Sequence, residues 1–123
     1  MKIKITSQNK KDYLLIISKG TLLVTEDLFE HAEMIYVEIS KYKQNKILIE
    51  ESKTVFPQSL FAYSDLVKFY EKLLHQSRQL KIAAVIPESD KKIAEFWETV
   101  CANKGFEFRA FAVLTDAESW LIN

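Results

Sequence analysis

The sequence contains few of the residues that interrupt regular structure. Its 123 residues include only two glycines and two prolines, whereas average usage would give about fifteen. This scarcity excludes collagen-like, linker-rich and disordered chains, and it favours long elements joined by short connections. It also excludes the glycine-rich loops that bind phosphates, because neither GxGxxG nor GxxxxGK[ST] occurs.

Cysteine, histidine and net charge are also limited. The single cysteine, Cys101, cannot form an internal disulfide, which indicates a reducing compartment. One cysteine and two histidines cannot supply the ligand spacing of a structural zinc site. The 17 Lys and Arg residues balance the 17 Asp and Glu residues, whereas nucleic-acid binding normally needs a basic excess. We therefore expect no metal, no cofactor and no nucleic-acid partner.

Long apolar runs are missing as well. The longest, such as residues 14–17, are far too short to span a bilayer. The first thirteen residues, MKIKITSQNKKDY, lack the apolar core of a signal peptide. These observations predict a soluble, cytoplasmic protein, and the length predicts a single domain over residues 1–123.

The apolar pattern predicts alternating strands and helices. Two apolar runs separated by a short polar turn are expected to form an antiparallel hairpin. After the hairpin, strands and helices alternate, which predicts an α/β fold with a mixed, mostly parallel five-stranded sheet covered by helices. The expected order is β-β-α-β-α-β-α-β-α. Strands are expected at 2–6, 13–18, 46–50, 82–86 and 106–113, and helices at 25–43, at 64–76, between Asp90 and Gly105, and at 115–121.

Three stretches of the chain carry a resemblance to a known family. They are GTLLVTED at 20–27, LKIAAVI at 80–86, and the segment 106–121 with its ending AESWL. Taken in order, they span nearly the whole chain. The sequence resembles STAS-type domains, in particular the SpoIIAA-like (STAS/SEC14-like) branch. This resemblance implies a SpoIIAA/STAS-like fold and a non-enzymatic binding or regulatory module. The binding partner would be a protein or a small apolar, lipid-like ligand.

The resemblance also suggests a phosphorylation site. In signalling members, a strand ending in Asp leads to Asp-Ser-x-Gly at a helix N-terminus, and the serine accepts the phosphate. That pattern places Glu50 near the acidic position and Ser59 near the phosphoacceptor. Gln58 stands where the second Asp is expected, and the bulky Phe61 replaces the glycine. A phosphorylatable switch of the anti-sigma-factor-antagonist type at Ser59 is therefore an alternative hypothesis.

Aromatic side chains gather after the central strand. Because aromatic residues at helical spacing usually pack, we expect most of them in the core or in a subunit interface such as a homodimer. The alternative is a surface or apolar pocket that contacts a partner or ligand. The candidates for this surface, together with Glu50, are Phe56, Phe61, Tyr63, Phe69 and Tyr70.

Adjacent carboxylates at a strand end raise a third hypothesis, a small enzyme. Glu50 or Glu51 would act as acid or base. Successive strand residues point to opposite faces, however, so the two carboxylates should not converge, and we expect one to be solvated and the other ion-paired. Cys101 is expected to be buried and inert, and His31 and His75 are expected at surface or boundary positions.

Overall fold

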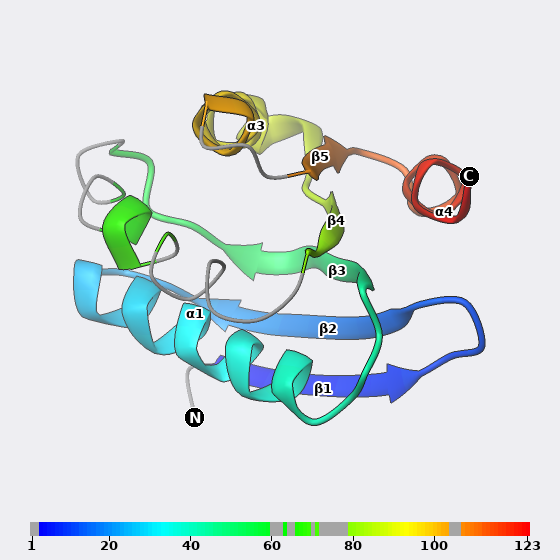
Figure 1. The fold of residues 1–123 in the computed structure, drawn as a ribbon. Helices are drawn as coiled ribbons and strands as arrows, with labels where there is room; N and C mark the ends of the chain where they lie inside the picture. The colour runs from blue at the N-terminus through cyan, green and yellow to red at the C-terminus, as the bar shows by residue number, and fades with distance from the viewer. Residues whose placement is uncertain (1–2, 60–62, 64–65, 70, 72–78, 104–106) are drawn as a thin grey trace.

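The computed structural model describes residues 3–59, 63, 66–69, 71, 79–103 and 107–123. Five strands form one sheet in sequence order (Figure 1): β1 (Ile3–Asn9), β2 (Leu14–Thr21), β3 (Lys46–Val55), β4 (Lys81–Val85) and β5 (Glu107–Phe111). β1 is antiparallel to β2, and all other neighbouring strands are parallel. The predicted mixed, mostly parallel sheet is confirmed.

Helices cover both faces of the sheet. α1 (Thr25–Ser40) connects β2 to β3, and a short 3-10 turn (Glu88–Asp90) leads into α3 (Lys91–Asn103), which connects β4 to β5. Figure 1 shows α3 and α4 (Leu114–Ile122) on opposite sides of β5. α1 and α3 share one face because right-handed crossovers between sequential parallel strands place their helices on the same side. No helix in the described part of the chain is long and apolar enough to cross a membrane.

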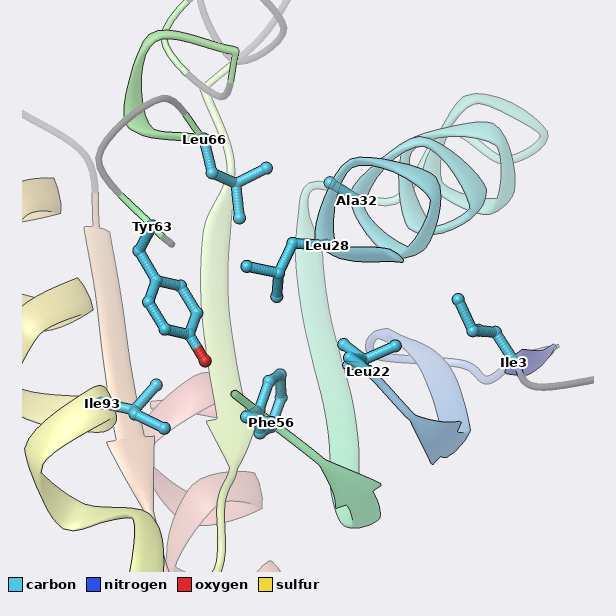
Figure 2. Packing of buried hydrophobic residues seen from close by; sticks show 8 residues of the cluster. All are labelled: Ile3, Leu22, Leu28, Ala32, Phe56, Tyr63, Leu66 and Ile93. Atoms are coloured by element: carbon cyan, nitrogen blue, oxygen red, sulfur yellow. The ribbon is translucent and has the colours of Figure 1, made fainter. Parts of the chain in front are cut away.

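The core on the α1 side is assembled from segments distant in the sequence. In α1, Leu28, Ala32, Ile35 and Ile39 recur at steps of four and three and are buried, which is the apolar face that the pattern predicted. Figure 2 shows side chains from the sheet and helices converging on one cluster, made of Ile3, Leu22, Leu28, Ala32, Phe56, Tyr63, Leu66 and Ile93. This cluster fixes the start of α1 against the end of β3.

α4 packs on the other face, over β3, β4 and β5. Its buried Ala117 and Leu121 contact a cluster that includes Leu48 and Val85. Tyr13, immediately before β2, donates a hydrogen bond to the Glu118 carboxylate. This face therefore has its own small core.

β3 extends beyond the predicted strand end. We predicted a strand over 46–50, but β3 continues to Val55. It does so because β2 also extends to Thr21 and pairs with it. Ile17 of β2 pairs with Glu50 of β3, and Lys19 pairs with Lys53. One residue lies between the two pairs in β2, whereas two residues lie between them in β3. The extra residue forms a β-bulge, a feature that re-aims side chains.

The backbone of β5 has a partner besides β4. The carbonyl of Phe111 accepts the N–H of Ile86 at the end of β4, at 2.8 Å. The preceding residue, Ala110, therefore directs its N–H away from β4. That N–H donates to the Glu98 carboxylate of α3, at 2.9 Å.

Several predictions concern residues outside the described ranges. Within the helix predicted over 64–76, residues 66–69 and 71 are described and are helical, and the other residues of that range lie outside the described residues. Gly105, the predicted boundary of the third helix, also lies outside them.

Candidate functional site

The β-bulge places Glu51 and Thr54 on the same face of the sheet, against α1. Three residues apart in a regular strand, they would point to opposite faces. Both are buried, with exposed fractions of 7% and 3%. Ser18 of β2 and His31 of α1 are also buried, at 1% and 5%. The four polar side chains form one group, which we call the His31 cluster.

The His31 cluster is held by short polar contacts. His31 Nε2 lies 3.0 Å from Ser18 Oγ and 2.7 Å from Glu51 Oε1. Ser18 Oγ lies 2.7 Å from Thr54 Oγ1. Glu51 Oε1 has no directed hydrogen bond, so its contact with the ring is an ion-pair contact. The ring tautomer sets which of Ser18 and His31 donates in the other contact.

This geometry does not form a catalytic triad. In a triad, the carboxylate binds the ring nitrogen opposite to the one that contacts the nucleophile. Here Ser18 and Glu51 both contact Nε2. Ser18 is also buried and bonded to Thr54. The cluster instead ties α1 to β2 and β3.

The prediction that His31 lies at a surface or boundary position is wrong. His31 is buried because it lies on the apolar face of α1, three residues after Leu28 and four before Ile35. That spacing was the signal available in the sequence. The partners Ser18 and Thr54 were not predicted either, since nothing local in the sequence marks them. His75 lies outside the described residues.

Glu50 and Glu51 diverge. The Glu50 carboxylate is half-buried and accepts the backbone N–H of Ser52 at 2.7 Å. Glu51 faces α1 and pairs with His31. The structure therefore brings no two carboxylates together at the position of the proposed acid/base pair.

The aromatic candidates divide between core and boundary positions. Phe56 and Tyr63 are buried in one cluster (Figure 2), and the Tyr63 hydroxyl donates to the Pro57 carbonyl at 2.8 Å. Burial, with the nearby charge of Asp90, raises the pKa of Tyr63. Phe69 is half-buried, and its ring meets Phe29 edge-on at 5.4 Å. Phe61 and Tyr70 lie outside the described residues.

Ser59 is exposed and follows a well-anchored segment. Gln58 Nε2 donates to the Phe56 carbonyl at 3.0 Å and to the Asp90 carboxylate at 3.2 Å. These bonds hold the chain just before Ser59 near the 3-10 turn that precedes α3.

Two other features are weaker candidates for a functional site. A shallow pocket of about 180 Å³ lies between α3 and the ends of β4 and β5, and residues such as Pro87, Lys91 and Phe111 line it. Burial raises the pKa of the Cys101 thiol to about 11. Among the described residues, no three His, Cys, Asp or Glu side chains gather as metal ligands would.

Comparison with known proteins identifies the type of fold. No protein-family model matches the sequence, and no curated protein matches it. An anti-sigma factor antagonist from Mycobacterium paratuberculosis superposes with a TM-score of 0.66 at 14% identity, over 98% of this chain and 95% of that one. An uncharacterized protein from the DUF3478 family with a SpoIIAA-like fold, from Shewanella loihica, gives 0.60 at 21% identity, over 98% and 94%. The chain has a SpoIIAA-like, STAS-type fold.

Within this SpoIIAA-like fold, exposed apolar side chains gather beside the His31 cluster. Leu22 N–H donates to the Val55 carbonyl at 2.8 Å, which holds the chain entering α1 against the end of β3. Leu23, Val24 and Val55 are exposed by 66%, 50% and 55%. We call these three residues the Leu23 patch.

Proposed function

We propose that this chain is a non-enzymatic regulatory module that binds a partner protein through the Leu23 patch. The observation that carries the proposal is an apolar surface on an ordered backbone, in a fold shared with a protein named as an anti-sigma factor antagonist. Clustered apolar side chains that a partner could cover are a common mark of a protein interface.

The backbone beneath the patch is held in place. The buried Asp27 carboxylate accepts the N–H groups of Leu23 and Val24, at 2.8 and 3.2 Å. An acidic side chain in the first turn of α1 also complements the helix dipole. A preorganised surface loses little conformational freedom on binding, so the patch suits docking better than an unsupported loop would.

The neighbouring Ser59 supports a second, switch-like form of the proposal. Ser59 is exposed and lies four residues after Val55, so a phosphate there would add negative charge beside the patch. Phosphopeptide mass spectrometry on protein from its native cells tests this form. An unmodified Ser59 in growing, starved and stressed cells would reject it while leaving the binding proposal intact.

An apolar ligand remains the alternative occupant. Phe56 and Tyr63 are packed in the core, so such a ligand would have to separate them. Native mass spectrometry of the purified protein tests this alternative, because a retained lipid would add a discrete mass. A ligand-free spectrum, with no binding of an apolar dye, would count against it.

Substitution of the patch tests the leading proposal. The intact chain and the variant L23S/V24S/V55S are used as baits in lysate of the source organism, and any retained protein is then purified and titrated calorimetrically. Proteins bound by the original chain should lose at least tenfold in affinity for the variant, since three exposed apolar side chains are removed. The control is V37S, a single exposed valine on α1 away from the patch. Equal binding by all three proteins would overturn the proposal.

A further inference from the structure

A row of three lysines crosses β1, β2 and β3. Lys4 pairs with Lys19 in the antiparallel register, and Lys19 pairs with Lys53 in the parallel register. Neighbouring strands lie about 4.8 Å apart, so the three Cα atoms span about 10 Å. The sheet thus aligns three positive charges side by side.

The lysine row faces away from α1. Each lysine has a sequence neighbour that is buried on the α1 side: Ile3, Ser18 and Thr54. Strand side chains alternate between faces, so the lysines point to the other face, where all three are exposed. α4 covers that face over β3, β4 and β5 and lies away from β1 (Figure 1). The row therefore lies on the part of the face that α4 leaves open.

No acidic side chain in the described part of the chain lies within ion-pair distance of these three ammonium groups. Glu50 precedes Lys53 on this face, but its carboxylate accepts the Ser52 N–H. Like charges directly opposite one another destabilise a sheet. A row of three lysines without an ion pair therefore lowers the stability of the fold. Residues that lower stability in this way are often retained because they take part in binding.

Another lysine pair in the same sheet shows the compensated arrangement. Lys46 and Lys81 are also direct cross-strand partners. Lys46 Nζ donates to the Ile122 carbonyl at 3.0 Å, and Lys81 Nζ donates to the Trp120 carbonyl at 2.9 Å. These carbonyls belong to the last turn of α4, where the helix dipole is negative. The lysine row has no such acceptor among the described residues.

We propose that the lysine row is a docking site for an acidic segment of the partner protein. This inference rests on the proposed partner-binding function. Val55 follows Lys53 by two residues on the same strand and is exposed, so the Leu23 patch meets the row at Val55. An apolar patch beside a charged rim is the usual composition of a protein interface, and opposite charge on the partner provides orientation and a fast encounter.

The charge distribution favours a polypeptide over a membrane or a nucleic acid. The formal net charge of the chain is zero, whereas those polyanions are bound through a broad basic excess. The positive charge of the row is confined to about 10 Å, the length of about three extended residues. Two or three neighbouring carboxylates would match it.

The test measures binding of a fluorescein-labelled hexaglutamate peptide by anisotropy, with hexaglutamine as the blank. The row variant is K4Q/K19Q/K53Q. The matched control is K11Q/K43Q/K92Q, which removes three exposed lysines elsewhere and changes the net charge equally. We expect the row variant to lose at least tenfold in affinity and the control to lose less than threefold, because three ion pairs are lost in the first variant only. Added salt should reduce this difference.

Stability gives a second readout that does not need a ligand. Lys19→Gln removes the central charge of the row, so its melting temperature should rise above that of Lys43→Gln. Equal affinity losses in the two triple variants would overturn the proposal. So would binding to phosphatidylserine-containing vesicles without binding to the peptide, which would indicate a membrane surface. Displacement of the peptide by inorganic phosphate at the same concentration would overturn it in favour of a small-anion site.

The two proposals can fail separately. If a partner loses affinity for the patch variant but binds the row variant normally, the function stands and the lysine row proposal fails. If no partner depends on the patch, the function fails, and the peptide experiment still decides whether the row binds acidic chains.

Discussion

Lys46 and Lys81 are direct cross-strand partners, and both donate hydrogen bonds to the last turn of α4. The ammonium group of Lys81 also lies 4.6 Å from the centre of the Trp120 ring. Two like charges that would repel one another therefore attach the C-terminal helix to the sheet. α4 is held at its end by these lysines and near its middle by Tyr13 and Glu118.

Replacement of Lys81 should weaken this attachment. Lys81→Met loses the bond to the Trp120 carbonyl and the cation–π contact, so we expect the free energy of unfolding to fall by about 1–2 kcal/mol. Urea denaturation followed by circular dichroism measures the change. Lys92→Met, at an exposed position of α3, is the control and should change stability little. Equal effects in both variants would contradict the attachment.

The His31 cluster predicts that loss of His31 destabilises the fold more when Glu51 is present than when Glu51 is replaced by glutamine. His31→Ala leaves the buried Glu51 carboxylate without the ring that it contacts at 2.7 Å, which should destabilise the fold by about 3–5 kcal/mol. Glu51→Gln in the same background removes the unpaired charge and should restore at least about 1 kcal/mol of that loss. Urea denaturation of the four proteins in the cycle gives the coupling. A double variant no more stable than His31→Ala alone would show that the carboxylate is not charged.

Tyr13 predicts a loss of stability at alkaline pH. Burial, followed by the hydrogen bond to Glu118 and its negative charge, raises the pKa of Tyr13 from 10.0 to about 12. The fold thus favours the neutral phenol, so this stabilisation is fully present below pH 10 and is lost as the pH rises from 10 to 12. Stability measured at about pH 9 and about pH 11.5 should fall less in Tyr13→Phe than in the original chain. Parallel losses in the two proteins would assign the effect to other groups.

Cys101 should react slowly in the folded protein. With a pKa of about 11, its thiolate fraction at pH 8 is about a hundredfold below that of an ordinary cysteine, and burial restricts access further. The rate of reaction with Ellman's reagent, measured with and without urea, should differ by at least this factor. A native rate close to the unfolded rate would show that α3 exposes the thiol.

The fold could be predicted because its signals are local. The apolar face of α1 and the apolar run at 82–86 occupy continuous stretches of sequence, and the alternation of strands and helices leaves few ways to arrange a mixed sheet. The length of β3 could not be predicted in this way. The segment ESKT at 51–54 is polar and is typical of a loop. It becomes a strand because β2 pairs with it, and because Glu51 pairs with His31 and Thr54 is hydrogen-bonded to Ser18 on the buried face.

The candidate site depended on contacts between distant residues. Ser18 and Thr54 are 36 residues apart and meet only because a single extra residue bends β3. The bulge lies in a polar segment, where an inserted residue does not disturb any apolar alternation that could reveal it. The lysine row depends in the same way on two strand registers, since Lys4, Lys19 and Lys53 are separated in sequence and aligned only by pairing.

The bond between Glu98 and Ala110 has a consequence for self-association. An outer strand whose N–H groups are free can recruit a strand from another molecule and extend the sheet. Glu98 occupies such a donor on β5, so a homodimer that extends the sheet would join through β1 instead, with the two copies of β1 antiparallel about a two-fold axis. Glu98→Ala would free the Ala110 N–H and open β5 to the same pairing, so that a sheet extended at both outer strands could grow without closing.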